Sequence, residues 1–384
     1  MRDGLTRLSQ GDEQTVGLVR GRKVGLLAHP ASVDATLRHA SEVLPAAGAD
    51  LRAIFGPEHG YTGHAQYMVG VSDAQAAIPI YSMYGETFED LSPKPTQLAG
   101  LDAVVVDLQD VGSRYYTFVW SMALMLKACA QAGVQCIVLD RPNPIGGEIL
   151  EGAPQRPGYR SFVGLYDVPV RHGLTIGEIA RMVLDLDGLP KEALQVVPMQ
   201  GWQRGASFAE TGLPWVLPSP NMPTPETALV YPGGCLLEGT NVSEARGTTR
   251  PFELFGAPFI DGAKLARVGG PGVRLRACAF EPTFNKFKGA TCHGVQVHVH
   301  DASAVRSYEL YLRAIAWIAR TYPEFAWRTE PYEYVSDRPA IDLLTGGPEY
   351  RAVASSESAL ADYLRAGDAQ LREFGLRRRP WLLY

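Results

Sequence analysis

The chain has 384 residues with a formal net charge of −5, and 20% of its residues are charged and 46% hydrophobic. This length exceeds what one hydrophobic core usually supports and therefore predicts two domains. The composition excludes long disordered regions, and the scattered Lys and Arg residues exclude nucleic acid as an expected partner.

The first half of the sequence alternates short apolar, β-branched runs with longer segments of helical periodicity, such as residues 120–132. This alternation is typical of βα units and predicts a parallel sheet with right-handed connections. The expected strands are residues 23–28, 51–55, 78–81, 103–108, 136–139 and 194–198.

Residues 202–258 differ in character, because they are rich in Pro, Gly, Thr and Asn and show little periodicity. An irregular stretch of this length in a compact protein is usually a linker or a binding surface, and its aromatic and polar content favours a binding surface. Two antiparallel strands, 273–280 and 294–299, are expected next. Helices are expected near residues 307–321 and 358–366.

We therefore expect an α/β fold, with a Rossmann-like, doubly wound parallel sheet followed by a smaller α+β domain. The predicted boundary gives a Rossmann-like catalytic domain at residues 1–200 and an α+β domain at residues 201–384 that completes the cleft. The basic cluster at residues 377–379 precedes an apolar C-terminus, which predicts a docked end rather than a nucleic-acid or membrane tail.

The N-terminal residues 1–14 lack the apolar core of a secretion signal, and no later apolar run is long enough to cross a bilayer. The five cysteines form no C-x-x-C pair, which fits reduced thiols. Both observations predict a cytoplasmic protein without a membrane partner, although a secreted form trimmed of its signal would look the same. No feature of the sequence indicates an oligomeric state.

Several cofactor and nucleophile motifs are absent. No G-x-G-x-x-G sequence follows the first expected strand and no Walker-type loop occurs, so we expect no nucleotide cofactor. The lack of a G-x-S-x-G elbow leaves acyl-enzyme chemistry without a candidate. The pairs His59 with His64 and His298 with His300 lack a third ligand at suitable spacing, so no metal is expected. Of the reaction types considered, hydrolysis by carboxylate side chains therefore remains.

Ligands of open parallel sheets bind beyond the carboxyl ends of the strands, so the residues that follow each strand are informative. The second expected strand runs into GPEHG at residues 56–60, where flanking glycines allow a sharp turn that presents a side chain openly. Glu58 and His59 are therefore candidates for a general acid or base. The alternative is a helix cap followed by a surface histidine.

Two further strand ends are polar. After the fourth strand, we expect Asp107 to cap the next element, while Asp110 faces the crevice. After the fifth strand, an ion pair between Asp140 and Arg141 would order the turn, and Asn143 is the better candidate for a ligand contact.

A glycine- and threonine-rich loop carries Asn241, Glu244 and Arg246. Because it contains both charge signs, it is suited to close over a substrate bound to the first domain. Asn241 also begins a glycosylation pattern, but that pattern needs a secreted eukaryotic context for which nothing else argues.

A series of ordered motifs extends along nearly the whole chain. They are GPEHG from Gly56, YSMYG from Tyr81, DLQDVGSRYYTF from Asp107, DRPNPIGG from Asp140, RHGLTIGE from Arg171, PSPNMPT from Pro218, YPGGCLLEGTNVSEARGT from Tyr231 and the terminal RPWLLY. In this series the chain resembles the NamZ-type exo-β-N-acetylmuramidases, a glycoside hydrolase family long described as a domain of unknown function. Ala245 departs from the glycine expected in the SEARGT loop.

The resemblance implies removal of terminal N-acetylmuramic acid from the non-reducing end of peptidoglycan fragments, without a cofactor. The missing signal then suggests recycling of imported fragments. By analogy with the family, Glu58 is the principal catalytic carboxylate and His59 orients it or the substrate. The second carboxylate stays open among Asp110, Glu238 and Glu244, and assistance by the acetamido group of the substrate is a further alternative.

A bidentate arginine would recognise the lactyl carboxylate of muramic acid, and three arginines lie in expected crevice loops. Tyr115, Tyr116 and Trp215 could stack on a sugar ring, with core packing as the alternative. A catalytically inactive sugar-binding protein and a metal-dependent hydrolase using His59 and His64 remain alternative functions. The expected substrate-binding residues are Arg114, Tyr116, Arg141, Asn143, Asn221, Glu238, Asn241, Glu244 and Arg246.

Overall fold

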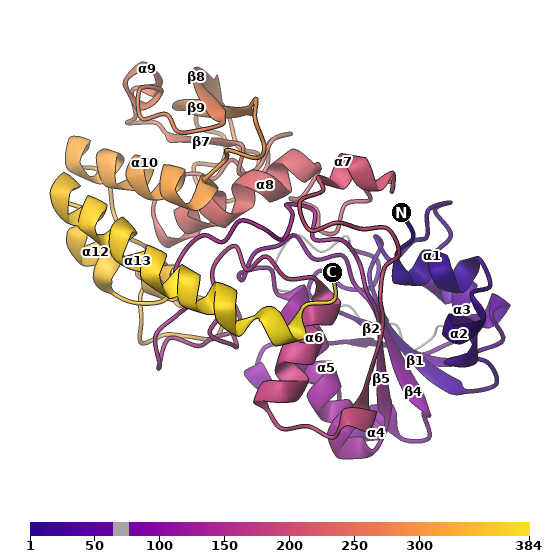
Figure 1. The fold of residues 1–384 in the computed structure, drawn as a ribbon. Coiled ribbons are helices and arrows are strands. Elements are labelled where there is room, and N and C mark those ends of the chain that lie inside the picture. The colour runs from indigo at the N-terminus through magenta and orange to yellow at the C-terminus, as the bar shows by residue number, and fades with distance from the viewer. Residues whose placement is uncertain (64–76) are drawn as a thin grey trace.

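The structure is a computed structural model that describes residues 1–63 and 77–384. It combines a parallel sheet flanked by helices with a second part, residues 208–384, that contains an antiparallel sheet and long helices (Figure 1). We call residues 208–384 the C-terminal part.

The six parallel strands follow the order β3-β2-β1-β4-β5-β6. This is the order of a doubly wound Rossmann sheet, and it confirms the predicted fold class. The central strand β1 pairs with a neighbour on each side, since Leu27 lies opposite both Phe55 and Val106. The strands are β1 Lys23–Ala28, β2 Asp50–Gly56, β3 Ile80–Ser82, β4 Ala103–Asp107, β5 Gln135–Leu139 and β6 Leu194–Val197.

Helices cover both faces of this sheet, which explains why its strands are apolar along their length. Successive side chains of a strand point to opposite faces, so Val24 and Leu26 join one buried cluster and Leu27 joins the other. The first cluster includes α1 Gly4–Ser9, α2 Glu13–Gly17 and α3 Ala40–Ala46. The second includes α4 Pro95–Leu98, α5 Phe118–Ala132 and α6 Ile176–Leu186.

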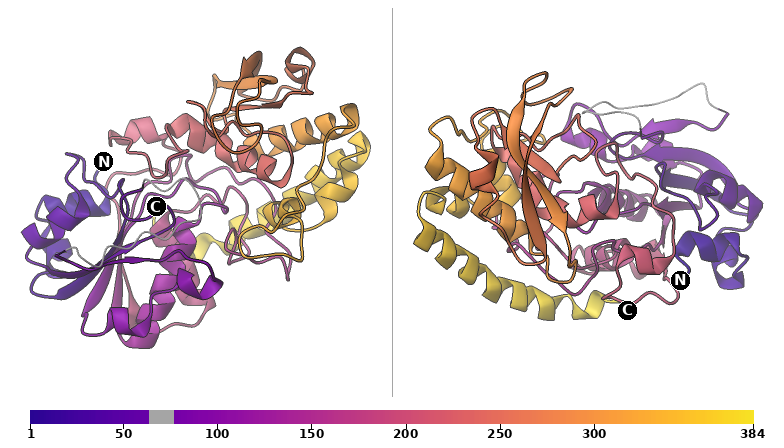
Figure 2. Two further views of the ribbon diagram at one scale, coloured as in Figure 1. Left: turned by 180° about the vertical axis from the view of Figure 1, so that it is seen from behind. Right: turned by 90° about the horizontal axis from the view of Figure 1, so that it is seen from above.

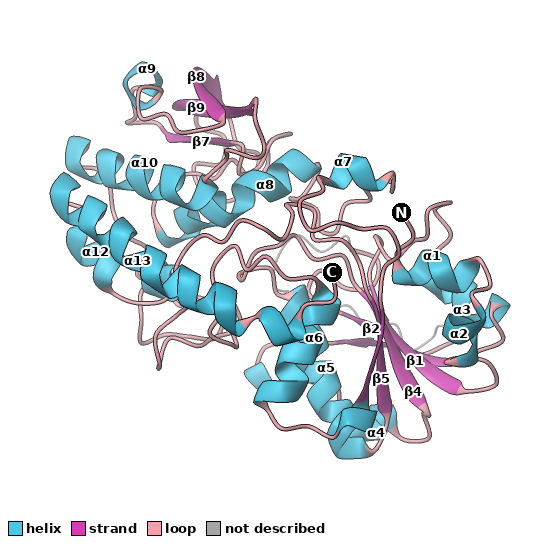
Figure 3. Ribbon diagram, viewed as in Figure 1, coloured by secondary structure: helices cyan, strands magenta, loops and turns pink. Residues whose placement is uncertain are grey.

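The C-terminal part contains a three-stranded antiparallel sheet in the order β7-β9-β8 (Figure 3). Helices α8 and α10 pack so closely that a Cβ atom at Gly233 would lie only 2.1 Å from the carbonyl oxygen of Ser307. Only glycine fits at this contact. The strands are β7 Leu254–Ala257, β8 Val273–Phe280 and β9 Cys292–Val299. The helices are α7 Phe208–Thr211, α8 Pro225–Gly234, α9 Gly262–Leu265, α10 Ser307–Thr321, α11 Ala340–Thr345, α12 Glu349–Val353 and α13 Glu357–Arg377.

The segment 202–258 is more ordered than the sequence predicted, because it includes α7, α8 and β7. Prolines and glycines obscure the helical period of α8, yet they mark its start. Thr224 caps the helix by accepting a hydrogen bond from the Thr227 amide, and Pro225 occupies the first turn. The last predicted helix is also longer than expected, since α13 continues to Arg377.

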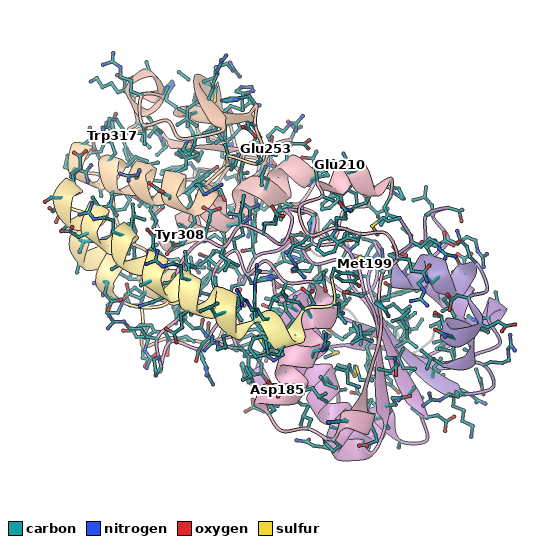
Figure 4. All side chains as sticks on the ribbon, in the orientation of Figure 1. Asp185, Met199, Glu210, Glu253, Tyr308 and Trp317 are labelled. Atoms are coloured by element: carbon teal, nitrogen blue, oxygen red, sulfur yellow. The ribbon has the colours of Figure 1, made fainter. Side chains whose placement is uncertain are left out.

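The C-terminus is docked, as predicted, and the two ends of the chain lie near each other (Figure 2). Arg378 is buried and donates to the Gly173 carbonyl at 2.7 Å. The Tyr384 hydroxyl donates to Asp140 at 2.7 Å and accepts from the amide of Met199, which Figure 4 labels, at 2.6 Å.

Arg141 belongs to a buried ion cluster at the carboxyl ends of β4 and β5. Its guanidinium lies 2.6 Å from Asp107 and 3.2 Å from Asp3, and it also donates to the Val33 carbonyl. Burial raises the pKa of Asp107, and the charge of Arg141 opposes this shift. The predicted Asp140–Arg141 pair is wrong, because the Asp140 carboxylate accepts from Thr175, Gly177 and Tyr384 instead.

Replacing Arg141 by alanine should lower the free energy of unfolding by about 3–5 kcal/mol, because it leaves two buried carboxylates uncompensated. Urea denaturation measures the loss. The matched control is Arg52→Ala, which breaks an exposed pair with Asp50 and should change stability little. Equal, small effects of both variants would contradict the assignment of Arg141 as a buried structural charge.

Candidate active site

A cavity of about 520 Å³ lies beyond the carboxyl ends of β2 and β4, between the parallel-sheet part and the C-terminal part. The predicted site residues that line it are Glu58, His59, Tyr116, Asn221, Glu238, Glu244 and Arg246. Lining residues that the sequence analysis did not single out as site residues include Thr117, Lys286, Arg328, Tyr332 and Glu333.

Glu58 stands in a tight turn directly after β2. Gly56 is required at the strand end, because a Cβ atom there would lie 2.4 Å from the Tyr61 nitrogen. His59 adopts a left-handed backbone with φ 70, which completes the turn. The Thr117 hydroxyl, at the start of α5, donates to Glu58 Oε2 at 2.7 Å and fixes the carboxylate at the cavity wall.

Glu244 and Glu238 are held by cations. Lys286 Nζ lies 2.9 Å from Glu244, and the Arg246 guanidinium pairs with Glu238 and lies 3.5 Å from Glu244. Burial opposes ionisation of Glu244, but the charges of Lys286 and Arg246 outweigh it and lower the pKa of Glu244. The Tyr332 hydroxyl donates to Glu238 at 2.8 Å. Both glutamates are therefore engaged by neighbouring cations, and these contacts order the surrounding loop.

Ala245, between these charges, has a left-handed backbone with φ 60. Glycine adopts this conformation without the steric cost that a Cβ atom brings. The geometry agrees with the glycine that the family pattern led us to expect at this position.

Glu333 faces the same cavity from the loop at residues 328–334, which we call the 328–334 loop. The Tyr84 hydroxyl donates to its Oε2 at 3.4 Å. Burial, with the negative charges of Glu58 and Glu238, raises the pKa of the Glu333 carboxyl to about 8, although Arg246 opposes the shift. The sequence analysis missed Glu333 because it follows no strand and belongs to none of the motifs.

The structure places four predicted substrate-binding residues outside the cavity lining, and they are Arg114, Arg141, Asn143 and Asn241. Arg114 is fully buried and donates to three main-chain carbonyl groups, one of them in α11. Arg141 lies in the ion cluster with Asp3 and Asp107. Asn241 bridges two main-chain groups at residues 324 and 326. These side chains form hydrogen bonds or ion pairs with other groups of the protein, so their placement does not support direct contact with a substrate.

Asp110 and Asn143 are also buried away from the lining residues. Asp110 accepts from the Gly112 amide at 2.8 Å and lies 3.2 Å from His172 Nε2. Asn143 donates to the Leu174 carbonyl at 3.0 Å. Both side chains order the loops that follow β4 and β5.

Aromatic rings form one wall of the cavity. Tyr231 meets Tyr116 and Phe252 edge to face, with ring centroids 6.1 and 4.9 Å apart. Tyr115 lies in the same wall, whereas Trp215 packs on Phe208 outside it. Stacking of Tyr115 or Tyr116 on a sugar ring stays a prediction.

Within residues 1–63 and 77–384, no group of three His, Cys, Asp or Glu side chains is arranged to hold a metal ion. His64, named with His59 as a possible ligand, lies outside these residues. None of the helices in the same ranges is long and apolar enough to span a membrane.

A cavity lined by carboxyl groups and aromatic rings, at the carboxyl edge of a Rossmann-like sheet, suits an enzyme of the glycosidase class. The family description "Exo-beta-N-acetylmuramidase NamZ" matches the sequence in two sections, its N-terminal section at residues 24–226 and its C-terminal section at residues 229–384. The chain belongs to the NamZ family.

Relatives support this assignment along the full length. The peptidoglycan β-N-acetylmuramidase NamZ of Bacillus subtilis is 40% identical over 374 residues, which cover 95% of this chain and 88% of the relative. Crystal structures of two DUF1343 family proteins from Bacteroides fragilis cover 100% of this chain and 98% of their own. Their TM-scores are 0.85 and 0.75, at 32% and 26% identity.

Removing the hydroxyl that orients Glu58 should slow the reaction. Thr117→Val should lower kcat by roughly 10- to 100-fold, the range expected for one hydrogen bond to a charged group. Thr117→Ser keeps the donor and should restore most of the activity. Steady-state kinetics on a muramic acid glycoside would expose the assignment as wrong if the valine variant matched the wild type.

Proposed function

We propose that this protein is an exo-β-N-acetylmuramidase that releases terminal N-acetylmuramic acid from the non-reducing end of peptidoglycan fragments. The observation that carries the proposal is the position of Glu58, fixed by Thr117 in a cavity shared with four other glutamates. Membership of the NamZ family supports the substrate class. The division of the chain near residue 200 stays a prediction.

Glycoside hydrolysis needs a carboxyl group beside the anomeric carbon, where positive charge develops in the transition state. Glu58 supplies that group, either by bonding to the carbon or by stabilising the acetamido group of the substrate as it does so. His59, its neighbour in the turn, orients Glu58 or the sugar. The cavity has the size of a small-molecule site, which suits one terminal sugar better than an internal stretch of polymer.

Muramic acid differs from N-acetylglucosamine by a lactyl carboxylate, so discrimination requires a cation that the protein has not already neutralised. Lys286 and Arg246 are engaged by Glu244 and Glu238. Arg328 is less so, because its partner Glu330 lies 3.8 Å away and is 73% exposed.

Arg328 is therefore the residue that we assign to the lactyl group. Its guanidinium is held over the Tyr332 ring, 5.2 Å from the centroid, and donates to the Pro331 carbonyl. These contacts leave donors available for a bidentate bond to a carboxylate.

Glu58→Gln should abolish release of the terminal sugar while the protein stays folded. The test incubates both proteins with a chromogenic N-acetylmuramic acid glycoside and follows the released chromophore. Glu89→Gln, a change at an exposed position that does not line the cavity, is the control and should retain activity. Full activity of the Glu58 variant on a verified substrate would refute the assignment.

Calorimetry on the same proteins separates an enzyme from a sugar-binding protein. The Glu58 variant should still bind muramic acid compounds. Binding by the wild type without any product would favour the inactive sugar-binding alternative.

Arg328→Ala should reduce the preference for the N-acetylmuramic acid glycoside over its N-acetylglucosamine equivalent by about 10- to 100-fold in kcat/KM. The loss should fall on the muramic acid substrate, because only that substrate carries the carboxylate. Arg365→Ala removes an exposed arginine as the matched control. If the ratio of kcat/KM for the two glycosides is unchanged in the Arg328 variant, another residue recognises the lactyl group.

A further inference from the structure

Five glutamates line the cavity, and their surroundings differ. Glu86 is exposed at the rim, whereas Glu238 and Glu244 are paired with Arg246 and Lys286. Within the described chain, no Lys or Arg forms an ion pair with Glu58 or Glu333. These two carboxyl groups therefore remain available for chemistry on a substrate.

The two groups reach the cavity from different segments of the chain. Glu58 follows β2, and the neighbouring strand β3 leads to Tyr84 and Gly85. Tyr84 donates to Glu333 at 3.4 Å, and Tyr334 donates to the Gly85 carbonyl at 2.9 Å. The 328–334 loop is thus attached to the strand beside the one that carries Glu58.

The backbone of the 328–334 loop is tightly bent at Glu333. Both Glu333 and Tyr334 have left-handed φ values, 47 and 67, which are costly for residues with a Cβ atom. The bend persists because Tyr332 and Val335 exchange two main-chain hydrogen bonds, of 2.9 and 3.0 Å, and because Tyr332 is bonded to Glu238. Strained non-glycine residues held in this way concentrate at functional sites.

The surroundings of the two carboxyl groups differ. The Thr117 hydroxyl donates to Glu58 Oε2 and orients that carboxyl group. Burial and the negative charges of Glu58 and Glu238 raise the pKa of Glu333 to about 8, so Glu333 carries a proton at neutral pH. A glycosidase needs a carboxylic acid that keeps its proton until it meets the glycosidic oxygen, and a second carboxyl group in a different environment.

We propose that Glu333 is the proton donor of the reaction, a role that no sequence motif indicated. This inference rests on the proposed function. The Glu333 carboxyl gives its proton to the glycosidic oxygen as the bond from that oxygen to the anomeric carbon breaks, and the electron pair of the bond stays with the leaving sugar. Glu58 or the substrate acetamido group stabilises the anomeric carbon. Water then adds to that carbon, and a site carboxylate takes the proton that the water loses.

The test compares two leaving groups in Glu333→Gln. A sugar leaving group needs protonation, whereas a nitrophenolate departs without it. On a disaccharide of N-acetylmuramic acid and N-acetylglucosamine, the variant should lose roughly 100- to 10,000-fold in kcat. On the nitrophenyl N-acetylmuramic acid glycoside, its loss should stay within about tenfold. Glu58→Gln should lose activity on both.

A pH profile adds a readout that a structural role would not move. Wild-type kcat/KM on the disaccharide should fall as the pH rises through about 8, because Glu333 loses its proton there. The residual activity of the Glu333→Gln variant on the same disaccharide should lack this alkaline limb. Asp337→Asn, a change at a largely exposed position four residues away, is the control and should keep the wild-type profile.

The outcomes are distinct. Equal loss on both leaving groups in a folded Glu333 variant, or wild-type activity on both, would overturn the assignment of Glu333. An alkaline limb retained in that variant would do the same. If the wild type cleaves neither substrate, the proposed function fails instead.

Discussion

Placing several negative charges close together in a partly buried space costs electrostatic free energy, and this constraint determines how the glutamates of the cavity are arranged. Arg246 and Lys286 form ion pairs with Glu238 and Glu244, so these two cations are not free to neutralise another carboxylate. Among the described residues, no Lys or Arg forms an ion pair with Glu58 or Glu333, and the negative charge of Glu58 disfavours ionisation of Glu333. We infer that Glu333 therefore keeps its proton close to Glu58, an arrangement that acid-catalysed cleavage of a glycosidic bond can use.

The fold supplies the rigidity that such a pair needs. Glu58 is fixed directly after β2, while Glu333 belongs to a loop some 270 residues further along the chain. One hydrophobic cluster extends from the sheet to helices α10 and α13 and joins both regions. Fully buried Arg114 strengthens the junction, because it follows β4 and donates to a carbonyl of α11. The shared core therefore fixes the positions of the two carboxyl groups relative to each other.

The sequence predicted what local patterns determine. Continuous apolar runs identified the strands, and the Gly-Pro-Glu-His-Gly turn identified Glu58 as a cavity residue, because strand ends converge at one edge of a parallel sheet. Arg114 and Arg141 show the limit of that reasoning, since a polar residue after a strand can serve buried backbone or a buried ion cluster equally well. Reasoning from strand ends could not find Glu333, because only tertiary packing brings its loop to the cavity.

The most direct test is a crystal structure of Glu58→Gln with the disaccharide of N-acetylmuramic acid and N-acetylglucosamine bound. The muramic acid ring should lie in the cavity, with its glycosidic oxygen within hydrogen-bond distance of Glu333, its anomeric carbon beside residue 58 and its lactyl carboxylate on Arg328. A sugar bound in this cavity with Glu333 out of reach of the glycosidic oxygen would contradict the account of the two carboxyl groups.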